Sequence, residues 1–175
     1  MATALKINYP ASSADTTAIT ITLASLATSS TWLVGREATA VVNTTNLDLD
    51  HLVGGTIMVG TTPTINTTIE VWAVAPYKAA SGTYTWPDSV TGTDAAITIT
   101  SAGVKAGFVR LVASLAVDAT TSNRAYPFAP VSIASLFGQL PPTWSIIVTH
   151  NTGVNLNATA GNHVIHYHRI QNQSV

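Results

Sequence analysis

Short runs in which apolar side chains alternate with threonine or another polar residue recur along most of this 175-residue chain. Such alternation puts the apolar side chains on one face of a strand and the polar ones on the other. Threonine, valine and isoleucine favour strands, and the chain holds 28 threonines but only 3 lysines and 2 glutamates. The clearest runs are residues 18–23, 39–43, 51–60, 68–74, 95–100, 108–117, 143–149 and 162–170.

About eight strands separated by glycine, proline and asparagine predict an all-β protein, an antiparallel β-sandwich. A jelly roll is the expected form, because the strand number fits and several connections are too long for simple hairpins. Gly54-Gly55 indicates a bulge or bend inside one long strand. One short helical turn is expected at residues 132–137, with Gly138 as its stop. We expect one sandwich domain over residues 14–175, after an N-terminal arm or first strand over residues 1–13.

The charge content limits the classes of partner. Only 9% of the residues are charged and the net charge is -1, so the basic face that nucleic acid requires is not expected. No uncharged apolar run approaches the ~20 residues of a membrane-spanning helix, and no membrane partner is expected. Soluble monomers usually carry about 25% charged residues. We therefore expect much of the surface to be buried in an assembly, either a cyclic oligomer or a larger lattice.

Signatures of catalysis are missing from the sequence. There is no cysteine, no G-x-S-x-G elbow and no glycine-rich phosphate loop, so we expect neither an enzyme nor a cofactor. Asp48 and Asp50, just before His51, would share a face of a strand. They fit a divalent-cation site or an acid/base pair, but also a polar strand entrance where aspartate favours the turn. The second interpretation is favoured, because no further ligand residues accompany the pair.

Histidines gather in the last predicted strand. His166 and His168 are two residues apart and would lie on one face, while His163 would lie on the other. The pair is a candidate metal site or subunit contact. A metal needs a third ligand from elsewhere, which a symmetric oligomer could bring. A subunit contact on a half-exposed strand is the favoured interpretation.

The longest connection, residues 75–94, carries several aromatic side chains. Connections of this length are usually functional. Tyr77, Tyr84, Trp86 and Asp88 are the candidate residues for contact with a partner. Tyr84, Trp86 and Asp88 also form the one set that would suit a sugar-binding cleft, with aromatic faces beside an acidic group.

Two stretches of the chain carry a resemblance to a known group of proteins. The first holds residues 21–27 (ITLASLA), 35–37 (GRE), 42–46 (VNTTN) and 50–53 (DHLV). The second holds residues 128–134 (FAPVSIA), 137–138 (FG), 140–144 (LPPTW) and 150–156 (HNTGVNL). Together they resemble jelly-roll capsid decoration (cement) proteins of tailed bacteriophages. The shared motifs are strand-and-turn patterns, with no catalytic signature among them.

The resemblance implies a non-enzymatic virion protein on the outer surface of a capsid. Its partners would be the major capsid protein and further copies of itself in a homotrimer. Such a protein would bind and stabilise the assembled shell, since binding one state alone favours that state. The alternative is a carbohydrate- or receptor-binding jelly-roll module on a phage head or tail fibre, because one fold hosts many functions. A metal enzyme using His166 and His168 is disfavoured, because clustered histidine and glutamate ligands are missing.

Overall fold

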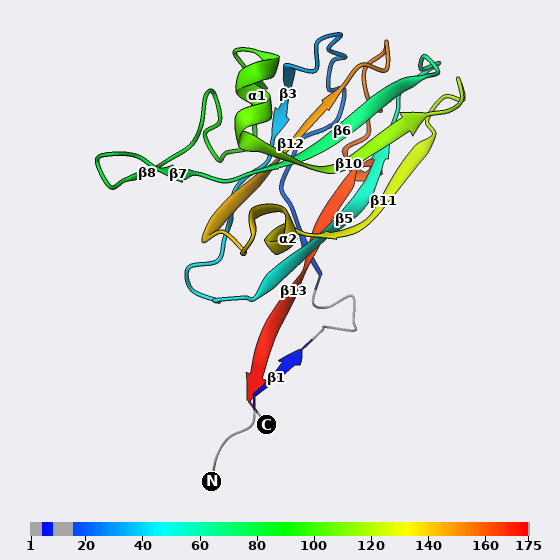
Figure 1. Ribbon diagram of the computed structural model, residues 1–175. Helices are drawn as coiled ribbons and strands as arrows, with labels where there is room; N and C mark the ends of the chain where they lie inside the picture. The colour runs from blue at the N-terminus through cyan, green and yellow to red at the C-terminus, as the bar shows by residue number, and fades with distance from the viewer. Residues whose placement is uncertain (1–4, 9–15, 175) are drawn as a thin grey trace.

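The structure is a computed structural model that describes residues 5–8 and 16–174. Strands make up most of its regular structure (Figure 1). They are β1 (Leu5–Asn8), β2 (Thr16–Ala18), β3 (Val34–Glu37), β4 (Val41–Val42), β5 (Asp50–Met58), β6 (Thr67–Val74), β7 (Tyr77–Lys78), β8 (Tyr84–Thr85), β9 (Ala95–Thr98), β10 (Val109–Val117), β11 (Ala125–Ser132), β12 (Thr143–His150) and β13 (Val164–Ser174). The helical segments are α1 (Ala102–Phe108), α2 (Ile133–Phe137) and the 3₁₀ turn η2 (Ala160–Asn162).

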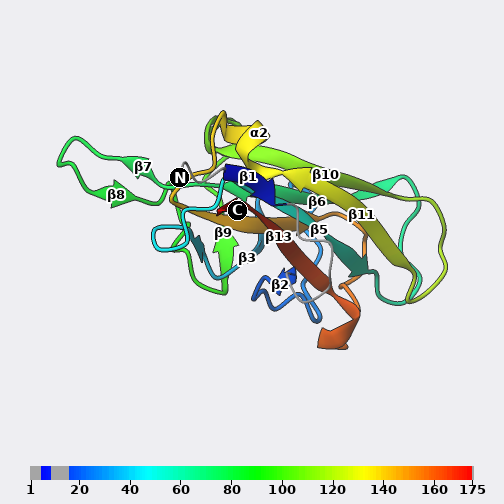
Figure 2. The ribbon, with the colours of Figure 1, turned by 90° about the horizontal axis from the view of Figure 1, so that it is seen from below.

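Two antiparallel sheets pack face to face. One has the order β2-β13-β5-β11 and the other the order β3-β12-β6-β10, which β9 extends by pairing with the free edge of β3. Following the chain through the eight strands of these two orders, every connection crosses to the opposite sheet except that from β6 to β10. This connectivity is that of a jelly roll, as the sequence predicts. β10 and β11, the outer strands of the two sheets, lie side by side and curl the sandwich toward a half-barrel (Figure 2).

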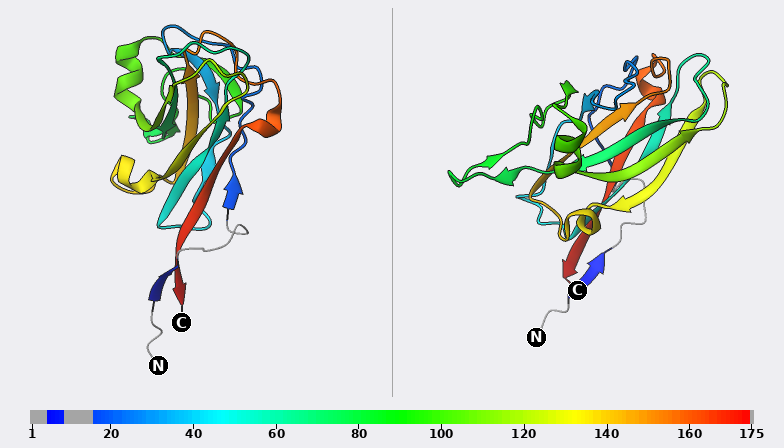
Figure 3. Two further views of the ribbon diagram at one scale, coloured as in Figure 1. Left: turned by 90° about the vertical axis from the view of Figure 1, so that its right-hand side faces the viewer. Right: turned by 45° about the horizontal axis from the view of Figure 1, so that its top comes forward.

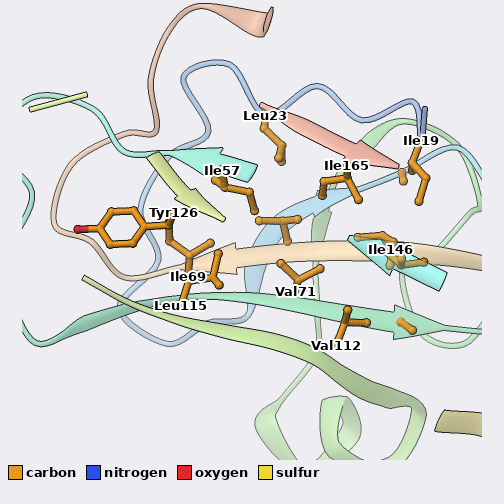
Figure 4. Packing of buried hydrophobic residues seen from close by; sticks show 14 of the residues in the cluster. Ile19, Leu23, Ile57, Ile69, Val71, Val112, Leu115, Tyr126, Ile146 and Ile165 are labelled. Atoms are coloured by element: carbon orange, nitrogen blue, oxygen red, sulfur yellow. The ribbon is translucent and has the colours of Figure 1, made fainter. Parts of the chain in front are cut away.

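The main core lies between the sheets. Ile57 and Ile165 of the first sheet face Ile69, Val71 and Ile146 of the second (Figure 4). All five side chains are at most 2% exposed. A fully buried isoleucine or valine stabilises the fold by about 1.5–3 kcal/mol, so this layer is a main source of stability.

A second, smaller core covers the outer face of the β3-β12-β6-β10 sheet. On β12, Ile146 and Val148 point into the main core, whereas Ile147 packs against Val74 and Val109 on the outside. The segment from β7 to α1 supplies the cover, with buried or half-buried residues Trp86, Val90, Ile97, Ile99 and Phe108. β12 is therefore buried on both faces, and every residue from Trp144 to His150 is buried, the polar side chains included.

The expected helical turn is present as α2. The hydroxyl of Ser132 accepts a hydrogen bond from the amide of Ser135, and Gly138 ends the helix with a φ of 81°. The sequence did not predict α1, which is capped by Ser101 and contains Gly103 and Gly107. Glycine is a poor helix former, so this segment has no helical signature of its own.

Gly54-Gly55 has a different role from the expected bulge. β5 runs through both glycines without a break, and the register shift falls on β11, between Phe128 and Val131. A Cβ atom at Gly55 would lie 2.2 Å from the carbonyl oxygen of Val164 on β13. The glycines therefore allow neighbouring strands to approach β5 closely.

Some strands were not predicted, and others are shorter than predicted. β11 contains Pro127 and Pro130, which the sequence pattern treats as breaks. It is an edge strand, where proline is tolerated because one side of the backbone has no partner. Of the run at residues 18–23, only Ala18 belongs to a strand, although Ile19 and Leu23 are buried.

Two β-ribbons project from the body of the sandwich. β1 pairs with the last residues of β13, from Asn8 opposite Gln171 to Leu5 opposite Ser174, and this ribbon carries both chain ends away from the core (Figures 1 and 3). The hairpin β7–β8 projects from a different side (Figure 3). In the predicted arm over residues 1–13, β1 forms a strand, and residues 1–4 and 9–13 lie outside the described residues.

Candidate interaction surface

The hairpin β7–β8 displays two of the four predicted contact residues. Tyr77 pairs with Thr85 and Lys78 with Tyr84, and Gly82 closes the turn with a φ of 85°. Such a φ suits glycine, which lacks a Cβ. Tyr77 is 54% exposed and Tyr84 is 62% exposed. The hairpin therefore presents two large aromatic rings to the surroundings, and contact of these rings with a partner stays a prediction.

Trp86 packs on the outer core and also borders a hollow with Tyr84, whereas Asp88 stabilises the local fold outside that hollow. The ring of Trp86 lies over Gly92, where a Cβ atom would be 2.8 Å from it, and packs on the outer core. Asp88 accepts hydrogen bonds from the Thr100 amide at 2.8 Å and the Thr100 hydroxyl at 2.6 Å. These bonds stabilise the carboxylate and lower the pKa of Asp88. Only Trp86 of this pair borders the same hollow as Tyr84.

Two adjoining hollows at the base of the hairpin form what we call the hairpin groove. The first has a volume of about 210 Å³ and is lined by Thr44, Pro76, Tyr84, Trp86, Pro142 and Thr143. The second has a volume of about 400 Å³ and is lined by Asn43, Thr44, Leu47, Asp48, Leu140 and Pro142. The hollows share Thr44 and Pro142, so they lie next to each other. Apolar side chains dominate this surface, which is typical of binding sites.

Leu47 stands at the rim of the groove in an unusual state. It is 74% exposed and has a φ of 52°, in the left-handed region that leucine rarely adopts. The Asn43 amide group holds this loop, since it donates to the carbonyl of Asp48 at 3.0 Å and accepts from the Asp48 amide at 2.8 Å. Leu47 is thus exposed at a strained backbone position, where asparagine or glycine would fit better.

A buried polar network supports the groove from below. Asp48, whose side chain is 1% exposed, accepts hydrogen bonds from Arg169 at 2.8 and 3.0 Å, from Gln171 at 2.8 Å and from His51 at 2.9 Å. Burial opposes ionisation of Asp48, but the hydrogen bonds from Arg169, His51 and Gln171 outweigh it and lower the pKa of Asp48 to about 2. The network fixes the loop carrying Leu47 to β13.

His51 extends this network across the sandwich. Its Nδ1 lies 3.0 Å from the indole Nε1 of Trp144, on the opposite sheet. Indole N–H groups only donate, so Nδ1 is the acceptor and the proton on Nε2 is donated to Asp48. Burial lowers the pKa of His51, and the neighbouring Asp48 offsets part of that effect. The neutral ring is therefore the form that the geometry requires.

Asp48 and Asp50 belong to two separate sets of hydrogen bonds. Asp50 accepts hydrogen bonds from the Ser132 hydroxyl and from the Ala134 amide at 2.8 Å, so it holds the start of α2. Asp48 belongs to the buried network with Arg169. The structure favours the interpretation that these carboxylates organise the local fold.

His166 and His168 lie on one face of β13, as predicted. Their ring centroids are 5.3 Å apart, and Nδ1 of His168 lies 3.1 Å from the Thr16 hydroxyl. Burial and the neighbouring His168 lower the pKa of His166. Within residues 5–8 and 16–174, no group of three or more histidine, aspartate or glutamate side chains is arranged to hold a metal. The rings remain candidates for a subunit contact.

The sequence did not reveal Leu47, Leu140 and Pro142 as parts of a site. Pro141-Pro142 is visible only as a strand stop, and the three residues meet because β4, β5 and β12 converge here. No protein-family model matches the chain, and no curated protein or solved structure matches it either. Among the described residues, no helix has the length and apolar character to cross a membrane. The geometry alone defines a jelly-roll protein with an apolar groove beside an aromatic hairpin.

Proposed function

We propose that this chain is a non-enzymatic decoration protein that binds the outer surface of an assembled tailed-phage capsid as a homotrimer. The observation that carries the proposal is the hairpin groove with its exposed rim. Tyr84 and Leu47 are each more than half exposed, and they border hollows with mostly apolar walls. Tyr77, on the same hairpin as Tyr84, is also more than half exposed. Aromatic residues at the centre of an interface contribute most when they are fully desolvated on binding.

The uncharged surface supports the same conclusion. With 9% charged residues, the chain has few groups to resist association, and the groove contains one carboxylate, the buried Asp48. The major capsid protein is the proposed partner for the groove. The projecting β1–β13 ribbon has two strands, so each strand has an edge whose backbone groups can pair with a neighbouring copy. A two-stranded ribbon is only marginally stable by itself, so such pairing would stabilise it.

Copy number in the virion tests the proposal directly. Quantitative mass spectrometry of purified virions of the phage that encodes the chain would measure its amount against the major capsid protein. We expect a copy number comparable to that of the shell subunit, and a trimer mass for the purified chain in native mass spectrometry. A handful of copies would instead indicate a tail tip or fibre, and absence from the virion would refute the proposal.

A substitution at Leu47 separates binding from folding. We expect Leu47→Asn to raise the free energy of unfolding by about 0.5–1 kcal/mol, because asparagine tolerates the left-handed backbone and little burial is lost. The same change should weaken binding to purified shells at least about tenfold, since a buried leucine contact is removed. Chemical unfolding and sedimentation with shells measure the two effects.

Leu111 provides a matched control for Leu47. It is 45% exposed on β10 and does not line the hairpin groove. Leu111→Asn should leave binding to shells unchanged. Equal loss of binding in the two variants would show that the groove is not the contact, whereas a selective loss in Leu47→Asn supports it.

A further inference from the structure

A third hollow lies on the outer face of the second sheet, beside α1. Its volume is about 230 Å³. Trp32, Leu33, Trp72 and Val109 form apolar walls, and all of them except Val109 are half-buried. Ala106 of α1 lies at its exposed rim. This volume is below that of sites for drug-sized ligands, and suits a single ring.

An ion pair is built into the wall of this hollow. The Lys105 ammonium donates to the Trp32 carbonyl at 2.8 Å, to Oε2 of Glu70 at 3.1 Å and to the Thr149 hydroxyl at 3.3 Å. It also lies 4.5 Å from the centroid of the Trp72 ring. All three ammonium protons are thus committed to the protein.

The two carboxylate oxygens of Glu70 differ in their hydrogen bonding. Oε2 accepts from Lys105, from Nε1 of Trp72 at 3.0 Å and from the Thr149 hydroxyl at 3.4 Å. In the part of the chain that the structure describes, Oε1 takes part in none of the hydrogen bonds. The Glu70 side chain is 22% exposed and lines the hollow. A charged acceptor therefore stands beside two indole rings.

The backbone at this hollow is strained. Trp32 has a φ of 53°, which is a genuine outlier for a bulky residue. Its carbonyl is held by Lys105, and its indole N–H donates to the Thr68 hydroxyl at 3.2 Å. Strain of this kind persists only where the surroundings hold it, and it concentrates at ligand sites. The fold thus holds the Trp32 ring at the wall of the hollow.

We propose that this hollow binds one neutral pyranose ring of a carbohydrate. The apolar face of the sugar would stack on the indole walls, and a hydroxyl would donate a charge-assisted hydrogen bond to Oε1 of Glu70. A cationic ligand would meet Lys105 over the Trp72 ring, and an anionic one would meet the Glu70 carboxylate. A neutral ring with one apolar face fits both constraints.

The inference goes beyond shell binding and concerns a different surface. The sequence favours Tyr84, Trp86 and Asp88 as a sugar-binding set, but Asp88 does not line the hollow that Tyr84 and Trp86 share. Trp32, Glu70, Trp72 and Lys105 come from three separate segments of the chain, since Glu70 and Trp72 both lie on β6. Failure of sugar binding would leave the decoration proposal intact, and the reverse also holds.

Saturation-transfer difference NMR on the full chain tests the proposal. The probes are D-glucose, D-galactose, D-mannose and N-acetyl-D-glucosamine, each titrated alone. We expect at least one of them to give a saturable signal on its ring C–H protons, with a Kd of about 1–10 mM, as suits one small ring. The absence of a saturable signal with all four sugars would overturn the proposal.

Two variants on α1 locate the site without touching the core. Ala106→Phe fills the rim of the hollow, whereas Val104→Phe places the same side chain on an exposed part of the helix that does not line it. We expect Ala106→Phe to weaken sugar binding at least about tenfold, and Val104→Phe to bind as the unchanged chain does. Retention of binding in Ala106→Phe, or equal loss in both variants, would overturn the assignment.

Glu70→Gln probes the acceptor itself. Glutamine keeps the size of the side chain but removes its charge, so we expect a loss of sugar affinity of about fivefold or more. Thermal unfolding accompanies the titration, because the same change leaves Lys105 without its ion pair. If Glu70→Gln does not fold, the comparison of the two α1 variants decides the question.

Discussion

Replacing Asp48 by alanine is expected to lower the free energy of unfolding by about 3–5 kcal/mol, which is the cost of removing one partner of a buried ion pair. Arg169, Gln171 and His51 all donate to this carboxylate. Alanine would leave the Nε2–H donor of His51 without an acceptor in a site where the ring is 1% exposed. It would also release the guanidinium of Arg169 from its bidentate contact.

Chemical denaturation of the two variants Asp48→Ala and Asp48→Asn measures this effect. Asparagine keeps the volume and one acceptor oxygen, so its cost should lie between those of the unchanged chain and Asp48→Ala. Asp118→Ala is the matched control. Asp118 also pairs with an arginine, Arg124 at 2.8 Å, but its side chain is 57% exposed, so we expect a loss of less than about 1 kcal/mol. Equal costs at the two positions would contradict the prediction.

The Asp48 network also explains why the groove and the fold are coupled. Asp48 lines the groove beside Leu47, and its partners Arg169 and Gln171 lie on β13. Through His51 the network reaches Trp144, which is fully buried in the main core. Movement of the Leu47 rim would therefore disturb hydrogen bonds inside the sandwich. A preformed rim binds with less loss of conformational entropy than a mobile one.

Local patterns were enough to predict the architecture. Alternation identified β5, β6, β10, β12 and β13, since each has at least one face in a core. Ser132 and Gly138 identified α2, because capping and left-handed termination depend on neighbours in the sequence. Elements set by tertiary contacts were missed. β11 is a strand because β5 holds it despite its two prolines, and α1 is a helix despite its two glycines.

The candidate sites were harder to predict, because their residues are distant in sequence. Asp48 and Arg169 are 121 positions apart, and His51 and Trp144 are 93 positions apart. The Asp48-x-Asp50-His51 pattern indicated polar chemistry but not the partners that make it a structural network. Tyr77 and Tyr84 were identifiable because a long aromatic connection is a local signal. The exposure of Leu47 depends on a backbone conformation that the sequence does not reveal.

Acidification is expected to destabilise the protein well above the pH at which its carboxylates titrate. His150 is 1% exposed, and its Nε2 lies 3.0 Å from the Leu26 carbonyl. Burial lowers the pKa of His150 from 6.5 to about 4, against hydrogen bonds to Leu26 and Ala27 that raise it. Because the folded-state pKa lies below the unfolded-state value, the contribution is complete above pH 6.5 and is lost as the pH falls toward 4.

The expected loss from His150 is about 3 kcal/mol between pH 7.5 and pH 4, at about 1.4 kcal/mol for each pKa unit. His51 adds to it in the same direction, since a proton on Nδ1 would face the Trp144 indole N–H. Asp48 contributes in a lower window, between about pH 4 and pH 2, because its folded-state pKa is about 2. The contributions of the buried histidines and of Asp48 to stability can therefore be told apart by the pH at which each is lost.

Urea unfolding at pH 7.5 and at pH 4 tests this prediction on the unchanged chain and on His150→Gln. Glutamine keeps a donor for the Leu26 carbonyl but does not titrate. We expect His150→Gln to be less stable at pH 7.5, and to lose about 3 kcal/mol less than the unchanged chain on acidification. The remaining loss then reports His51 and the exposed groups. An identical loss in both proteins would contradict the prediction, because it would show that protonation of the buried His150 costs the fold nothing.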